Sequence, residues 1–111
     1  MVIAEQTVGA VHVLKPDGPL KGDDAGRFKD RILELLGSTL GRCVVDASAI
    51  QFVDSKGLEA LVEANEAIAQ SGRTLKICGA SEAIQQVLEL TELAPQFEQF
   101  PDVNAAVRSF L

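Results

Sequence analysis

Short apolar segments with the period of a β-strand alternate with amphipathic segments of helical period along the whole chain of 111 residues. Neither a repeat nor a low-complexity linker interrupts this alternation. Such a pattern is typical of an α/β domain with a mostly parallel sheet, because each helix carries the chain back to the start of the next strand. The length falls within the usual range of about 50–200 residues for one domain, so we expect a single domain over residues 1–111.

The first two strands are expected to form a hairpin. Residues 2–4 and 10–14 are mainly apolar and lie on either side of Gly9, which can supply the turn. The following segment, from Lys15 to Pro19, contains two prolines and a glycine. Because proline is poorly tolerated inside a strand, this segment is predicted to end the second strand.

The remaining pattern predicts three further strands and four helices. A helix is expected from Asp23 or Asp24 to Gly37, and the nearly all-apolar run from Cys43 to Ile50 is expected to be the central strand, covered on both faces. The later elements are a helix after Asp54, a strand over 74–79, a helix capped by Ser81, a short strand over 97–100 and a last helix over 103–110. The predicted order is ββαβαβαβα, with a mixed, mostly parallel sheet of four to five strands.

Composition excludes several classes of function. The formal net charge of −6 disfavours a nucleic-acid partner, because most of the surface would repel phosphate. No apolar run approaches the roughly 20 residues of a membrane span, so we expect a cytoplasmic protein without membrane insertion. Cys43 and Cys78 lie in apolar surroundings and His12 is the single histidine. We therefore expect core thiols, no metal site and no cofactor.

The segment from Phe52 to Leu58 is the most informative part of the chain. It joins the predicted central strand to a helix, and a helix N-terminus presents unpaired backbone N–H groups and partial positive charge. Ser55 could simply cap this helix. Alternatively, because Asp54 and Ser55 offer more capping oxygens than one helix start needs, one of them could be kept for a partner.

This segment resembles the STAS domain family, and within it the small anti-sigma factor antagonists. The resemblance rests on the apolar strand with Asp46, on the sequence FVDSKGL over 52–58, and on the strand TLKICG over 74–79 followed by a helix at Ser81. It extends over essentially the whole chain. It implies a STAS fold and a non-enzymatic protein that acts by binding.

The resemblance also implies a switch at Ser55, because antagonists of this type are phosphorylated on the serine at the matching position. Unmodified antagonist would sequester an anti-sigma factor that is also a serine kinase of the histidine-kinase-like ATPase class, and a PP2C-type phosphatase would restore the serine. The residues expected to bind the partner surround Ser55: Lys21, Asp23, Asp54, Lys56, Gly57, Leu58, Glu59 and Glu63. The alternative is a STAS subunit of an ABC-type lipid transport complex that binds the ATPase without phosphorylation.

Several residues leave the local chemistry open. Lys21 and Lys56 occupy positions where many relatives carry an acid and a hydroxyl, and together they could hold a phosphate or dock an acidic partner. Glu59, Glu63 and Glu66 form either an acidic stripe for a basic partner or a plain solvated face. A hydrolase that uses Ser55 and His12 would need a nucleophile elbow, and the chain has Asp-Ser-Lys-Gly instead.

Overall fold

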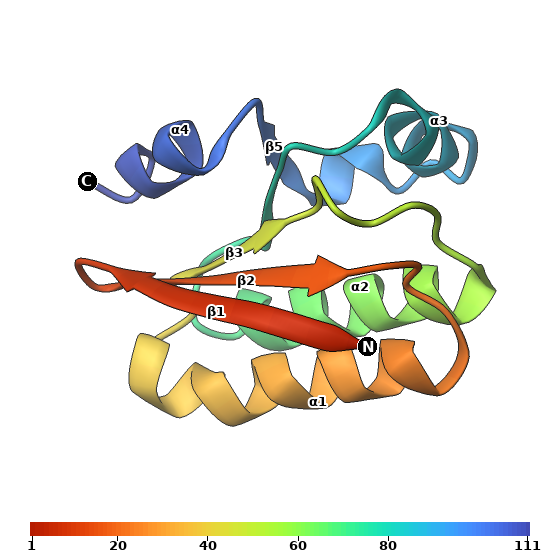
Figure 1. The fold of residues 1–111 in the computed structure, drawn as a ribbon. Coiled ribbons are helices and arrows are strands. Elements are labelled where there is room, and N and C mark those ends of the chain that lie inside the picture. Colours follow the sequence, from red (N-terminus) through yellow and green to blue (C-terminus); the bar gives the residue numbers. More distant parts are fainter.

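The computed structural model describes residues 1–111 and contains five strands, four α-helices and one short 3-10 helix (Figure 1). The predicted order of elements is confirmed. The strands are β1 (Val2–Val8), β2 (Val11–Asp17), β3 (Cys43–Asp46), β4 (Lys76–Cys78) and β5 (Glu98–Phe100). The helices are α1 (Gly22–Thr39), α2 (Ser55–Ala69), α3 (Glu82–Leu90), η1 (Ala94–Gln96) and α4 (Val103–Arg108).

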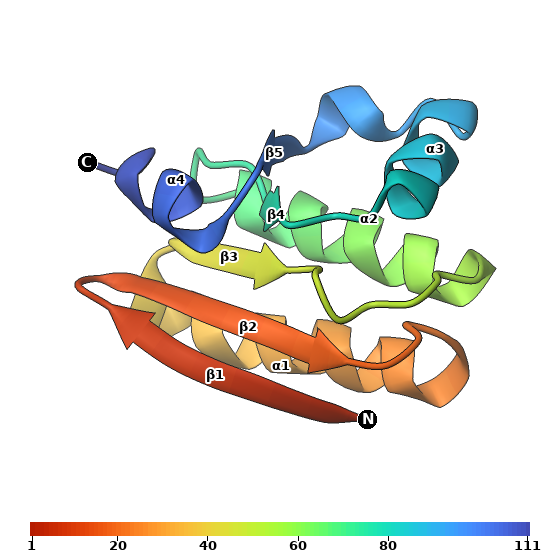
Figure 2. The ribbon, with the colours of Figure 1, turned by 45° about the horizontal axis from the view of Figure 1, so that its top comes forward.

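The sheet has the strand order β1-β2-β3-β4-β5, so the predicted central strand is β3. The hairpin β1–β2 is antiparallel, and every later pairing is parallel. Helices α1 and α2 cover one face of the sheet, whereas α4 lies on the other, as the two ribbon views show (Figures 1 and 2). This mixed sheet with helices on both faces is the architecture that the alternating pattern predicts.

Two hydrophobic clusters hold the layers together. The larger lies between the sheet and α1, α2 and α3, and includes Phe28, Ile32 and Ile68, whose side chains are fully buried. The smaller lies beneath α4 and includes Val44 and Cys78. Both cysteines are buried, as expected, and burial raises the pKa of their thiols, that of Cys78 to about 11. None of the helices combines the length and the apolar character needed to cross a membrane.

The predicted end of the second strand at Lys15 is wrong, because β2 continues through Pro16 to Asp17. Proline lacks an N–H, but the geometry of β2 is such that no hydrogen bond of the sheet is lost at Pro16. The N–H of His12 donates away from β1, to the Arg42 carbonyl at 2.9 Å, and Pro16 lies on the same side of the strand. Pairing with β3 ends at Leu14, so no neighbouring strand needs a donor at Pro16.

Other boundaries also differ from the prediction, among them the end of β1, which reaches Val8 instead of residue 4. Helix α1 runs past Gly37 to Thr39 and ends where Leu40 adopts a left-handed conformation, with φ of 55°. The central strand ends at Asp46 rather than continuing to Ile50. Asp46 accepts a hydrogen bond from the backbone N–H of Ser48 at 3.0 Å, which turns the chain out of the sheet.

Candidate functional site: two adjoining helix starts

The loops that follow β2 and β3 run side by side at the carboxyl ends of these strands. Leu20 and Val53 form an isolated parallel bridge. The N–H of Leu20 donates to the Phe52 carbonyl at 2.9 Å, and the N–H of Asp54 donates to the Leu20 carbonyl at 3.3 Å. These bonds bring the first residues of α1 and α2 together, although the two helices begin far apart in the sequence.

The carboxylate of Asp54 joins the two helix starts. Its Oδ1 accepts from the backbone N–H of Gly57 at 2.8 Å, which caps α2, and its Oδ2 accepts from the backbone N–H of Gly22 at 3.2 Å, in the first turn of α1. The bond from Gly57, followed by the bond from Gly22, holds the pKa of Asp54 below the ordinary carboxyl value. Asp54 is therefore ionised at neutral pH, next to the positive ends of two helix dipoles.

Ser55 is the first residue of α2 and is exposed to solvent. The interpretation of Ser55 as the cap is wrong, because Asp54 occupies the N-cap position and provides the capping oxygen. The Ser55 hydroxyl is therefore free of a capping role.

Gly57 and Leu58, also in the predicted partner-binding set, are less exposed than Ser55. Gly57 is buried, and a methyl group in place of its hydrogen would collide with the Leu20 carbonyl oxygen and the Val53 side chain. Glycine is needed here because the two loops approach so closely. Leu58 is half-buried and packs against the larger hydrophobic cluster. Both residues position Ser55 without contributing much surface themselves.

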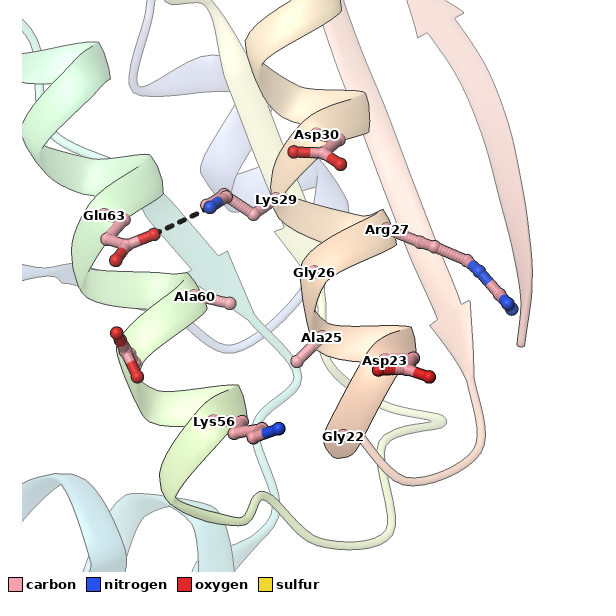
Figure 3. Close-up of a pocket in the computed structure, with 11 residues that line it drawn as sticks. Gly22, Asp23, Ala25, Gly26, Arg27, Lys29, Asp30, Lys56, Ala60 and Glu63 are labelled. Atoms are coloured by element: carbon pink, nitrogen blue, oxygen red, sulfur yellow. Dashed lines mark ion pairs between the residues drawn. The ribbon is translucent and has the colours of Figure 1, made fainter.

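A groove of about 500 Å³ lies between the first turns of α1 and α2 (Figure 3). Lys56 points across it toward the start of α1, and Asp23 and Glu59 also line it. Deeper along the groove Glu63 forms an ion pair with Lys29 of α1, with 2.9 Å between Nζ and Oε2. Glu63 thus links two helices, so the predicted acidic stripe reduces to the exposed Glu59 and Glu66.

Phe52 is a member of the site that the sequence prediction omitted. Its side chain is 48% exposed and precedes Ser55 by three residues. The Lys21 ammonium lies over its ring, 5.6 Å from the centroid, as in a cation–π contact. The sequence carries no clear signal for Phe52, because the same loop carries the apolar Ile50 and Val53 and exposure cannot be read from the sequence.

The charges around Ser55 are of both signs. Lys21 and Lys56 are exposed on the two adjoining segments, as are Asp23 and Glu59. His12 lies near the start of β2, at the other end of the strands, where its Nε2 is 2.9 Å from Glu5 Oε1. The structure therefore places the single histidine away from Ser55 and provides no serine–histidine pair.

Comparison with known proteins identifies the family to which the fold belongs. The family model described as STAS domain matches residues 2–106. A search of the curated proteins found no match.

Anti-sigma factor antagonists are among the solved structures that share the fold. A Thermotoga maritima protein described as a candidate anti-sigma factor antagonist is 22% identical, with a TM-score of 0.88, and the match covers 96% of this chain and 92% of that one. An anti-sigma factor antagonist from Mycobacterium paratuberculosis is 20% identical, with a TM-score of 0.84 and coverage of 97% and 92%. The anti-sigma factor antagonist SpoIIAA in its unphosphorylated form is 13% identical, with a TM-score of 0.75 and coverage of 98% and 96%. SpoIIAA from Bacillus has also been solved in its phosphorylated form.

Proposed function

The chain belongs to the STAS domain family, and on this premise we propose that it is an anti-sigma factor antagonist whose contact with an anti-sigma factor is controlled by phosphorylation of Ser55. The partner would be an anti-sigma factor of the histidine-kinase-like ATPase class, which would also be the kinase, and a PP2C-type phosphatase would reverse the modification. The protein acts by binding, not by catalysis. The antagonists named among the solved structures support this choice within the family.

One observation carries the proposal: Ser55 is exposed at the first position of α2 while Asp54 does the capping. A kinase can therefore reach the hydroxyl without unwinding the helix. A phosphate there would add a charge of about −1.5 to −2 at the positive end of the helix dipole, which offsets its repulsion by the neighbouring Asp54 carboxylate.

The surface around Ser55 provides the contact that the phosphate would break. Phe52 offers exposed apolar area, and Lys21, Asp23, Lys56 and Glu59 surround it with charges of both signs. A hundredfold loss of affinity corresponds to about 2.7 kcal/mol. Two added negative charges against an apolar or acidic partner surface can supply this amount.

The test mixes the purified chain with ATP and a purified anti-sigma factor of the histidine-kinase-like ATPase class from the same organism. We expect the mass of the chain to rise by about 80 Da, the mass of one phosphoryl group, with the modification on Ser55. Ser55→Ala should take up no phosphate and should still bind the partner. Ser55→Asp should no longer bind the partner. Ser48→Ala, which removes another exposed hydroxyl, is the matched control.

Two outcomes would contradict the proposal. One is equal affinity of Ser55→Ala and Ser55→Asp for the ATPase. The other is stable copurification of the unphosphorylated chain with a membrane transport complex, the result expected of a STAS subunit of an ABC-type lipid transporter.

A further inference from the structure

The two edges of the sheet differ sharply. Strand β5 forms one edge, spans three residues and is bounded by Pro95 and Pro101. Strand β1 forms the other edge and spans seven residues, Val2–Val8, without proline or lysine and with Glu5 as the single charge. Figure 2 shows β1 with no element beyond its outer side. Proteins usually prevent an edge strand from pairing with another chain by making it short or by placing prolines or charged residues in it. Strand β1 is long and has Glu5 as its single such residue.

The register of the hairpin shows which backbone groups of β1 are free. The N–H of His12 points toward β3, where it donates to Arg42. His12 and its partner Thr7 therefore form a pair without hydrogen bonds between them. Because such pairs alternate with hydrogen-bonded pairs along an antiparallel ladder, Glu5 and Ile3 also make no backbone hydrogen bonds to β2. The N–H and C=O groups of Ile3, Glu5 and Thr7 all point to the open edge.

The charge of Glu5 is already neutralised within the chain. Arg31 of α1 binds it with two hydrogen bonds, from Nε to Oε2 at 2.7 Å and from Nη2 to Oε1 at 2.8 Å. His12 Nε2 is 2.9 Å from the same Oε1. Because a forked arginine pair satisfies the carboxylate, Glu5 does not guard the edge as an unpaired acid would.

We propose that β1 pairs antiparallel with β1 of a second copy of this chain, about a twofold axis at Glu5. In this register the free groups of residues 3, 5 and 7 match one another, which gives six N–H···O=C bonds. On the face away from α1, Val2 of one copy lies opposite Val8 of the other, and Ala4 lies opposite Gln6. Val2 is 72% exposed and Val8 39% exposed in the single chain, so pairing covers apolar surface at both ends.

The proposal has a consequence for the partner surface. Helix α4 contacts β3, β4 and β5, so it does not obstruct the β1 edge. The dimer would have a continuous ten-stranded sheet, in which the antiparallel copies direct their Ser55 surfaces to opposite ends. Each dimer would then bind two partner molecules. The pairing itself does not depend on the phosphorylation of Ser55 and can be tested separately from it.

The interface is small, so we expect a reversible dimer with a dissociation constant between about 1 μM and 1 mM. Sedimentation equilibrium over this range should show the mass rising from 11.8 kDa toward twice that value. Thr7→Pro removes a free N–H from the edge and no bond within the chain, so it should stay monomeric, with an unchanged melting temperature where both proteins are dilute enough to be monomeric. Thr7→Val keeps the N–H and should dimerise like the wild type.

A charge-based pair of variants tests the same interface without changing the backbone. Arg31→Ala leaves the two Glu5 side chains facing each other across the twofold axis, and should weaken the dimer at least tenfold. Adding Glu5→Gln to Arg31→Ala removes the repulsion between the two carboxylates and should restore the dimer. A chain that is monomeric at 1 mM, or a dimer that survives both Thr7→Pro and Arg31→Ala, would overturn the proposal.

Discussion

The side chain of Asp54 accepts a hydrogen bond from the backbone N–H of Gly22, 32 residues earlier in the chain, at 3.2 Å. With the bond from Gly57, this contact makes one carboxylate the common cap of two helices. The relative position of α1 and α2, and hence the shape of the surface around Ser55, depends on it.

Replacing Asp54 should therefore loosen both helix starts. Asp54→Ala removes both acceptors, so we expect a lower melting temperature and faster amide exchange at Gly22 and Gly57. Asp102→Ala, which removes the cap of α4 at Ala105, is a matched control. It should lower stability without changing exchange at Gly22. Unchanged exchange at Gly22 in Asp54→Ala would show that the bridge does not hold α1.

Gly57 and Gly37 should respond in opposite ways to alanine. At Gly57 the added methyl collides with the Leu20 carbonyl, and such overpacking costs about 1–3 kcal/mol of unfolding free energy. At Gly37, inside α1 with nothing near the new methyl, alanine should stabilise the protein by about 0.5–1 kcal/mol. Chemical denaturation of the two variants measures both effects, and equal midpoints would refute the close approach at Gly57.

Phe52 should be the apolar anchor of the partner surface. Phe52→Ala is expected to weaken binding of the anti-sigma factor at least tenfold, about 1.4 kcal/mol, because exposed aromatic residues dominate many interfaces. The control is Leu90→Ala, since Leu90 is 84% exposed on α3 and lies outside the site. Titration calorimetry would measure both affinities, and a similar loss for both variants would show that Phe52 has no special role.

Glu5 should make stability depend on pH in the acidic range. Arg31 in the first place, with His12, lowers the pKa of Glu5 to about 2 from 4.5. Because the folded pKa lies below the unfolded one, the contribution is complete above about pH 4.5 and is lost as the pH falls toward 2. Solvent screening limits it to about 1 kcal/mol. Denaturation at pH 6 and pH 2.5 should show this loss in the wild type, and a smaller loss in Glu5→Gln.

Local patterns were sufficient for the order of elements and for the identity of the central strand. The all-apolar Cys43–Val45 segment indicated a strand covered on both faces, and Ser81 indicated a helix start, which its bond from Ile84 at 3.2 Å confirms. These signals lie within a few residues of the feature they predict. The same reasoning placed the candidate site at the turn before α2.

What the sequence could not give were contacts between segments far apart in the chain. The hydrogen bond from Gly22 to Asp54, the ion pair of Glu63 with Lys29, and the pairing of Glu5 with Arg31 all depend on how the helices pack on the sheet. The same holds for Pro16, which fits in β2 because β3 has already ended beside it. Periodicity reports which side of an element is buried, whereas only the packed structure determines which side chain lies opposite it.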